Sequence, residues 1–396
     1  MSERAPSNAR ESRFEVIYQN GAARLGRIKT SHGTFETPIF MPVGTNANVK
    51  LMRSDELKKI GATIILANAY HVAVRPGLDV IELHGGLHRF MSWDGGILTD
   101  SGGFQMFSLK NFRKVSDDGV TFVSPYDGSK LFLTPELSMD IQTILGSDIV
   151  MVLDHCPAID ASYAEALEAT KRTHEWAKRC LRHGVREGQL LFAIAQGGAF
   201  EDLRRASARH LSQMDFDGFA IGGLSLGEPF EMTLQLAHAT ISELPEDKPR
   251  YFMGGGSPRT IIELVSLGVD MFDSVYPTRL ARHGAALTSE GRINIKSSRY
   301  RKDLSPIDSR CDCLVCKSYT RSYVHHLFNR GETLAGMLLT YHNLHFMFRF
   351  MERVRKSIMD GRLEEMRKEV AEVYEERGEN AAGVLASGHD SLRRHR

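Results

Sequence analysis

Eight short apolar segments, separated by stretches that carry helix signals, constrain the fold of this chain more than any other feature. The segments are almost continuously apolar rather than alternating, which is typical of parallel strands covered on both faces. They occupy residues 38–44, 63–68, 96–100, 148–154, 191–197, 218–223, 251–255 and 269–274. Eight such strands with helical crossovers predict a (β/α)8 barrel, to which a doubly wound open sheet is the main alternative.

Helix boundary signals lie between several of these segments. Thr134 is a predicted N-cap, Pro135 follows at the first turn, and Gly146 is a stop signal. Ser257 opens a second stretch with the same start signal, and a long amphipathic helix is expected to end at Gly184. Helices between strands are what a parallel sheet requires.

Polar residues or glycines stand where many of the apolar segments end. They are Asn68, Asp100, Asp154, Gln196, Gly222, Gly223, Gly254 to Gly256 and Asp273. In a barrel the carboxyl ends of all strands open on one face, where active sites are built. Aspartates far apart in the sequence are therefore expected to face each other across one pocket.

The charge of the chain is uneven. A net charge of +1 over 396 residues excludes a protein that binds nucleic acid through its overall charge. Residues 276–330, however, hold eleven Lys/Arg against four Asp/Glu. Such a basic zone is typical of a local phosphate-binding face, with a merely solvated basic surface as the alternative.

The ends of the chain are polar. Residues 1–13 and 376–396 are expected to be flexible arms, which leaves 14–375 for the barrel. No apolar run approaches the ~18 residues needed to span a membrane, and the N-terminus has no signal-peptide segment. We therefore expect a cytoplasmic protein without membrane contact.

A cysteine cluster near the C-terminal end predicts a structural zinc site. Cys311, Cys313 and Cys316 form a C-x-C-x2-C pattern, and His342 follows after 25 intervening residues. Three thiolates and one imidazole complete a tetrahedral site with no open position. His342 is preferred because it is expected to open a helix over 342–361 that the metal would pin to the cysteine loop. The other candidate histidines are His325, His326 and His345. Reduced cysteines without metal are the alternative.

Asp100 and Asp273 form a candidate catalytic pair. Two carboxylates on a pocket floor permit covalent catalysis at a sugar carbon, one as nucleophile and the other as proton donor and acceptor. The small residues after Asp100 allow a planar ring to approach the backbone. The alternative is that each aspartate caps the helix after its strand.

Other strand ends carry groups suited to a nucleobase edge. Gln196 offers an amide, Gly223 offers bare backbone, and Asp154 can accept hydrogen bonds from a guanine-like N–H edge. Phe104 and Met253 can stack on the ring faces. The alternatives are ordinary glycine turns and ordinary core residues.

These motifs together resemble the queuine/bacterial tRNA-guanine transglycosylase family. The resemblance rests on "TDSGGFQ", "AQGG", "GGLSLGE", "MGGGSP", "MFDSVYPTR" and the cysteine–histidine cluster, and it covers roughly residues 14 to 375. It implies a (β/α)8 barrel with a zinc-bearing insertion at about 295–345. It also implies one structural Zn2+ per subunit and a homodimer.

The activity implied by the resemblance is that of a pentosyltransferase. Family members exchange guanine at the wobble position of tRNAs with a GUN anticodon for a 7-deazaguanine base, in queuosine biosynthesis. Asp273 matches the nucleophile that bonds covalently to the tRNA ribose, and Asp100 matches the general acid/base. The positions that bind the base match Ser101, Phe104, Asp154, Gln196, Gly223, Leu224 and Met253. Arg279 and Arg282 are expected to hold tRNA phosphates, and the zinc ligands match Cys311, Cys313, Cys316 and His342.

Some positions bear on which base is used. Leu226 is bulkier than the valine of common bacterial forms, whereas eukaryotic forms have glycine there to admit queuine. Together with Cys156, this favours 7-aminomethyl-7-deazaguanine, while Ser225 and His155 leave queuine open. Three further alternatives are the archaeal type that acts in the D-loop, a non-catalytic tRNA-binding subunit and a barrel glycosidase.

Overall fold

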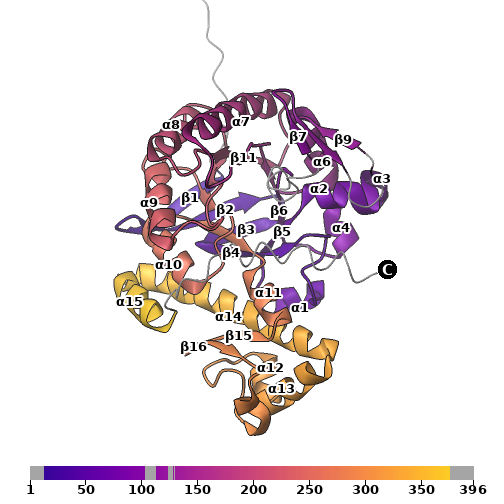
Figure 1. Cartoon of the computed structure of the whole chain (residues 1–396), viewed down its shortest axis with the longest axis vertical. Coiled ribbons are helices and arrows are strands. Elements are labelled where there is room, and N and C mark those ends of the chain that lie inside the picture. The colour runs from indigo at the N-terminus through magenta and orange to yellow at the C-terminus, as the bar shows by residue number, and fades with distance from the viewer. Residues whose placement is uncertain (1–12, 103–112, 124–127, 129, 375–396) are drawn as a thin grey trace, which may run out of the picture.

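A computed structural model describes residues 13–102, 113–123, 128 and 130–374. Its centre is a closed barrel of eight parallel strands (Figure 1). In barrel order from the first in the chain, the strands are β4 (Ile39–Gly44), β5 (Ile64–Ala67), β6 (Gly96–Thr99), β10 (Ile149–Met151), β11 (Leu190–Ala195), β12 (Gly218–Ile221), β13 (Arg250–Phe252) and β14 (Met271–Ser274). All eight apolar segments thus form barrel strands, and β14 closes the barrel by pairing with β4. The predicted (β/α)8 barrel is confirmed, and the open sheet is excluded.

Helices surround the barrel (Figure 1). They are α1 (Ser54–Lys59), α2 (Ala69–Val72), the π-helix η1 (Ala73–Gly77), α3 (Leu78–His84), α4 (Leu87–Met91), α6 (Pro135–Leu145), α7 (Tyr163–His183), α8 (Glu201–Leu211), α9 (Phe230–Ile241) and α10 (Pro258–Ser266). The predicted caps hold, because the Thr134 and Ser257 side chains accept hydrogen bonds from the backbone of the first turn. Helix α7 ends at Gly184 as expected.

An antiparallel sheet of β1 (Phe14–Asn20), β2 (Ala23–Thr30) and β3 (Gly33–Thr37) packs against the amino ends of the barrel strands. Arg24 in β2 is buried and forms an ion pair with Asp270, the residue before β14. His32, after β2, contacts Asp148 just before β10 through Nδ1 at 2.8 Å. The sheet therefore covers the end of the barrel opposite the one where active sites form, and its contacts contribute to the stability of the fold.

His88 joins His32 and Asp148 at that lower end, and its Nε2 lies 3.3 Å from Asp148 Oδ2. The three groups have the composition of a metal site. However, the two imidazole rings are stacked, with centroids 3.6 Å apart and planes only 15° from parallel. A metal lies in the plane of each imidazole that binds it, so nearly parallel stacked rings cannot share one ion. The cluster is a hydrogen-bonded network around a buried carboxylate.

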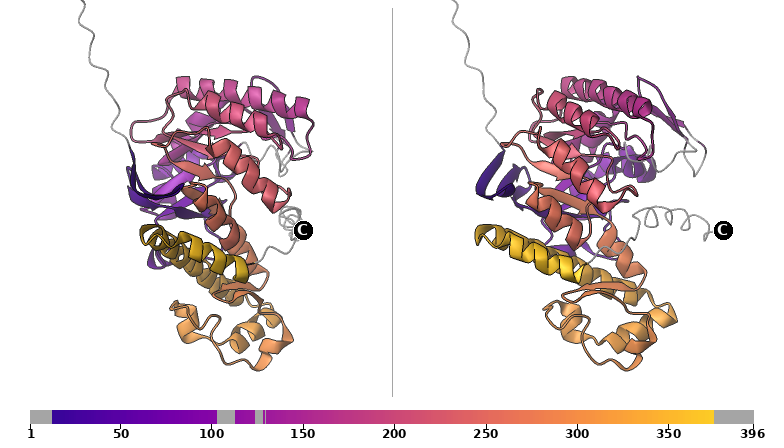
Figure 2. Two further views of the ribbon diagram at one scale, coloured as in Figure 1. Left: turned by 90° about the vertical axis from the view of Figure 1, so that its left-hand side faces the viewer. Right: turned by 60° about the vertical axis from the view of Figure 1, so that its left-hand side comes forward.

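The chain continues beyond the barrel into a subdomain that projects from one side (Figure 2). It contains α11 (Tyr276–Arg282), β15 (Ala285–Thr288), β16 (Gly291–Asn294), the 3-10 helix η3 (Ser298–Lys302), α12 (Leu314–Ser318) and α13 (Arg321–Arg330). The 27-residue helix α14 (Thr333–Met359) returns from the subdomain to the barrel, followed by α15 (Leu363–Val373). In the sequence between β6 and α6, another three-stranded sheet is formed by β7 (Arg113–Val115), β8 (Val120–Val123) and β9 (Lys130–Leu133).

Helix α14 corrects one expectation. It begins at Thr333, so His342 does not open a helix but lies on its third turn. The helix links the subdomain to the barrel, where the Phe348 ring lies 6.5 Å from that of Phe40 in β4. Within the described residues, no helix combines the length and apolar character that crossing a bilayer requires. The predicted arm (apart from Arg13) and the predicted tail lie outside the described residues.

Candidate active site and metal centre

Asp273 lies near the carboxyl end of β14 and is held by two hydrogen bonds. Its Oδ1 accepts from the Tyr251 hydroxyl at 2.6 Å and from the Gly254 amide at 2.9 Å. Desolvation by burial raises the pKa of Asp273, although these two donors oppose the shift. Residue 273 remains partly exposed, so a ligand can reach it. The arrangement presents one oriented carboxylate at the carboxyl end of the barrel.

Asp100 follows β6, which is separated from β14 by two strands, β4 and β5, around the barrel. Its Oδ2 accepts from the Asn68 amide at 2.5 Å, and its Oδ1 accepts from the Ala69 amide at 2.9 Å. Burial, then the negative charges of Asp273 and Asp100, hold the pKa of Tyr251 well above its usual value. Both carboxylates are therefore within electrostatic reach of the same phenol.

A second polar cluster surrounds Asp154, after β10. Its Oδ2 accepts from Gln196 Nε2 at 2.7 Å, and its Oδ1 lies 3.4 Å from the Ser101 hydroxyl. Desolvation raises the pKa of Asp154 to about 6, against the effect of these donors. At neutral pH the carboxylate is ionised and can accept hydrogen bonds from an N–H edge.

The loop after β12 is shaped to pack against this cluster. A Cβ atom on Gly223 would lie 2.5 Å from Gln196 Oε1, and one on Gly222 would lie 2.5 Å from Gln196 Nε2, so a side chain at either position would displace the Gln196 amide. Leu224, the next residue, is buried. Glu228 fixes the rest of the loop by accepting from the Ser225 amide at 2.5 Å and the Leu226 amide at 2.9 Å.

The structure brings the predicted base-site residues from β6, β10, β11, β12 and β13 to one end of the barrel. Met253 follows β13 and is only partly buried, next to the Gly254 amide that bonds Asp273. Phe104 lies outside the described residues. Sequence reasoning missed Tyr251, which orients Asp273, and it placed Asn68 at a strand end without assigning it the role of orienting Asp100.

A cationic cluster lies beside this end of the barrel, on α11 and the loop after β4. Burial and the neighbouring charges of Arg282 and Arg279 lower the pKa of Lys50. Arg279 Nη1 is buried and has no hydrogen-bond partner among the residues that the structure describes. None of the three side chains forms an ion pair with a carboxylate in the described part of the chain. Three uncompensated cations make a site for an anion such as phosphate. Lys50 was not predicted.

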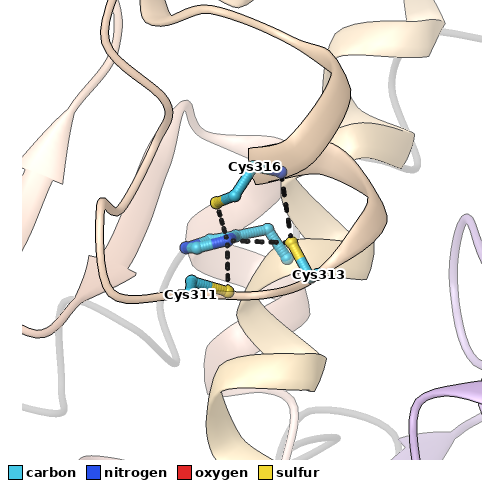
Figure 3. A group of neighbouring side chains, drawn as sticks. Cys311, Cys313 and Cys316 are labelled. Carbon is cyan, nitrogen blue, oxygen red and sulfur yellow. Dashed lines mark hydrogen bonds between the residues drawn. The ribbon is translucent and has the colours of Figure 1, made fainter.

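Figure 3 shows the three cysteines around one point. His342 is the fourth member of this group. His342 Nδ1 lies 3.7, 3.5 and 3.3 Å from the sulfurs of Cys311, Cys313 and Cys316. The sulfur–nitrogen edge of a tetrahedral site with ordinary metal–ligand bonds is about 3.6 Å. The other ring nitrogen, His342 Nε2, lies 2.8 Å from the Leu287 carbonyl, which leaves Nδ1 as the ligand atom. These four residues can hold a metal ion.

The fold and site define a (β/α)8 barrel with two oriented carboxylates at the carboxyl ends of its strands, a polar cluster around Asp154 at the same end and an appended Cys3His centre. The sequence profile described as Queuine tRNA-ribosyltransferase matches residues 19–376. A queuine tRNA-ribosyltransferase of Thermotoga sp. (strain RQ2) is 57% identical over 367 residues, which cover 93% of this chain and 99% of the relative. Its counterpart in Bacillus subtilis (strain 168) is 51% identical over 365 residues, or 91% and 96%.

The chain therefore belongs to the queuine tRNA-ribosyltransferase family. Membership confirms the resemblance found in the sequence. It also confirms the expected enzyme class, a pentosyltransferase of the tRNA-guanine transglycosylase type.

Proposed function

We propose that this enzyme exchanges guanine at the wobble position of tRNAs with a GUN anticodon for 7-aminomethyl-7-deazaguanine, in queuosine biosynthesis. The observation that carries the proposal is that Asp273 and Asp100 stand at the carboxyl ends of two strands of one barrel, each oriented by two hydrogen bonds, with Tyr251 bonded to Asp273 at 2.6 Å. The relatives are named for transfer of queuine to tRNA, which supports tRNA as the polynucleotide substrate.

The reaction proceeds in two displacements at ribose C1′. Asp273 bonds to C1′ as the bond to guanine N9 breaks, the electron pair goes to the base, and protonated Asp100 gives its proton to the leaving guanine. The Asp100 carboxylate then takes a proton from the incoming base, whose nitrogen attacks C1′ and releases Asp273. The target nucleotide leaves its stack to reach the pocket, which costs less in an anticodon loop than in a duplex.

Asp154, Gln196, Ser101 and the Gly223 backbone recognise the base edge, while Met253 and Phe104 enclose the ring. Leu226 favours the small 7-aminomethyl substituent over queuine. A competition assay with both bases and one tRNA tests this choice. Faster incorporation of 7-aminomethyl-7-deazaguanine is expected, and faster incorporation of queuine would reverse the assignment.

The activity itself is tested with enzyme, radiolabelled guanine and tRNA. We expect label to enter tRNA at the wobble position. Absence of label with the wild-type enzyme would favour the non-catalytic tRNA-binding subunit, and label in the D-loop would favour the archaeal reaction.

Lys50, Arg279 and Arg282 hold phosphates of the anticodon loop in this proposal. Arg279→Gln is expected to weaken tRNA binding. The slope of the logarithm of the binding constant against the logarithm of the salt concentration is expected to become shallower by about 0.7, which is the contribution of one phosphate contact to a single strand. Arg353→Gln is the matched control, because Arg353 is exposed and pairs with Glu369 on α15. Binding titrations between about 50 and 200 mM salt provide the measurement. Equal slopes for Arg279→Gln and wild type would remove this residue from the phosphate site.

The metal is proposed to be zinc, one structural ion per subunit, because three thiolates and one imidazole suit Zn2+. When bound, it would cross-link the cysteine loop to α14. Cys316→Ser is expected to lose the ion and expose the subdomain to protease, since structural zinc contributes on the order of 10 kcal/mol to folding. Cys180→Ser, at a buried cysteine of α7, is the control. Metal analysis and limited proteolysis test the site, and full zinc content in Cys316→Ser would contradict it.

A homodimer is also proposed. Tyr323, Leu334 and Met337 are exposed large apolar side chains in or beside the subdomain, and the Tyr323 ring stacks on that of Tyr319. Light scattering is expected to give twice the chain mass of 44.3 kDa. A monomer mass at working concentration would contradict it. The cytoplasmic location stays a prediction.

A further inference from the structure

Arg204 is a fully buried arginine that links two loops of the base site. It lies in the first turn of α8 and has 0% relative exposure. Its partners are carbonyl oxygens: Nε donates to Gly198 at 2.7 Å, Nη1 to Gly222 at 3.0 Å and Nη2 to Gly223 at 3.1 Å. No salt bridge to Arg204 is present in the described part of the chain. A buried cation held only by backbone carbonyls is costly, so its position calls for an explanation.

The carbonyl contacts fix the direction of two amide groups. In a planar trans peptide the C=O of one residue and the N–H of the next point in opposite directions. Because Arg204 holds the carbonyls of Gly222 and Gly223, the N–H groups of Gly223 and Leu224 point away from Arg204. Within the described chain neither amide has a hydrogen-bond partner, whereas the next two amides, of Ser225 and Leu226, bond to Glu228.

Two adjacent unpaired amides beside a buried residue are unusual and mark a ligand-facing backbone. Gly223 lies against Gln196, whose Nε2 bonds Asp154, so these donors adjoin the group proposed to accept from the base. A guanine-type ring carries its 6-oxo acceptor next to the N1–H donor on one edge. A carboxylate beside an amide donor complements that pair.

We propose that Arg204 is a positioning residue that aims the Gly223 and Leu224 amides at the 6-oxo group of the base. This inference rests on the proposed function. The planar fork of arginine spans three carbonyls at once, which the single ammonium of lysine does not reproduce. Gly197 makes room for the Arg204 side chain, since a Cβ atom at position 197 would lie 2.6 Å from Arg204 Cγ. Burial lowers the pKa of Arg204 to about 10, which still leaves the side chain charged at neutral pH.

The test is Arg204→Lys, assayed with two bases: 7-deazaguanine and 2-amino-7-deazapurine, which lacks the 6-oxo group. We expect KM for 7-deazaguanine to rise about ten-fold, the effect of one misaligned hydrogen bond, with kcat and KM for tRNA changed less than about two-fold. KM for the base without the oxo group is expected to change little, so discrimination between the bases falls.

Arg250→Lys is the matched control, because Arg250 is also buried, also bonds carbonyls (of Leu244 and Pro245), and lies at the amino end of β13. It is expected to lower the melting temperature without changing discrimination. If Arg204→Lys does not fold, Arg204→Gln is assayed with the same expectation. If the folded variant discriminates between the two bases as the wild type does, or if KM rises equally for both, the inference about Arg204 is overturned and the proposed function still stands. A wild-type enzyme that exchanges no guanine would reject the proposed function itself.

Discussion

Asp273→Asn is expected to abolish covalent capture of tRNA and to lower guanine exchange by roughly 10^4-fold or more, the scale of losing a catalytic nucleophile. Asparagine preserves the shape and can still accept from Tyr251 and Gly254, but its amide oxygen is a poor nucleophile towards C1′. The measurements are single-turnover exchange with radiolabelled guanine and denaturing gels of the enzyme with tRNA. Because burial raises the pKa of Asp273, wild-type exchange is also expected to fall as pH drops and this carboxylate becomes protonated.

Asp270→Asn is the matched control for this substitution. Asp270 is a buried aspartate three residues earlier, but it pairs with Arg24 at the closed end of the barrel. Its variant is expected to be less stable and still to capture tRNA. Capture by Asp273→Asn equal to that of the wild type would reject Asp273 as the nucleophile.

Asp100→Asn is expected to slow exchange by about 10^2- to 10^4-fold, the usual contribution of a general acid or base. The asparagine cannot give a proton to the leaving guanine or take one from the incoming base. Asp273 remains in place, so covalent tRNA is expected to form slowly rather than not at all. Rapid-quench measurements of capture and exchange separate these two outcomes.

Asp148→Asn serves as the control for Asp100→Asn, since Asp148 bonds His32 and His88 at the opposite end of the barrel. Burial alone would raise the pKa of Asp148, but the hydrogen bonds from His88 and His32 lower it overall. The Asp148→Asn variant is expected to be less stable than the wild type at pH values where Asp148 is ionised. Its rate of guanine exchange is expected to equal that of the wild type. A loss below about ten-fold in Asp100→Asn would remove Asp100 from proton transfer.

The barrel could be predicted because its strands are buried on both faces and therefore read as continuous apolar runs. The sheet of β1–β3 was missed, since strands such as Phe14–Asn20 leave most of their residues exposed or half-buried and form no continuous apolar run. Its attachment depends on the pair of Arg24 with Asp270, 246 residues apart, which no local pattern reveals. The start of α14 was missed because Gly336 interrupts the helical pattern ahead of His342.

The candidate site was predictable where its residues follow strands, as Asp100, Asp154 and Gln196 do. Tyr251 was not, because an aromatic residue inside an apolar strand looks like core. Arg204 left a signal that was overlooked: it shares the buried face of α8 with Leu203, Ser207 and Leu211, where a charged residue needs a buried partner. Lys50 gave no signal, because its neighbours Arg279 and Arg282 are more than 200 residues away in the chain.

Peptide mapping by mass spectrometry tests the central claim most directly. Wild-type enzyme is mixed with a tRNA anticodon stem-loop, quenched, and digested with nuclease and protease. A ribosyl adduct is predicted on the peptide that contains Asp273, attached to that carboxylate. An adduct on Asp100, or turnover with no protein-linked ribose at any time point, would contradict it.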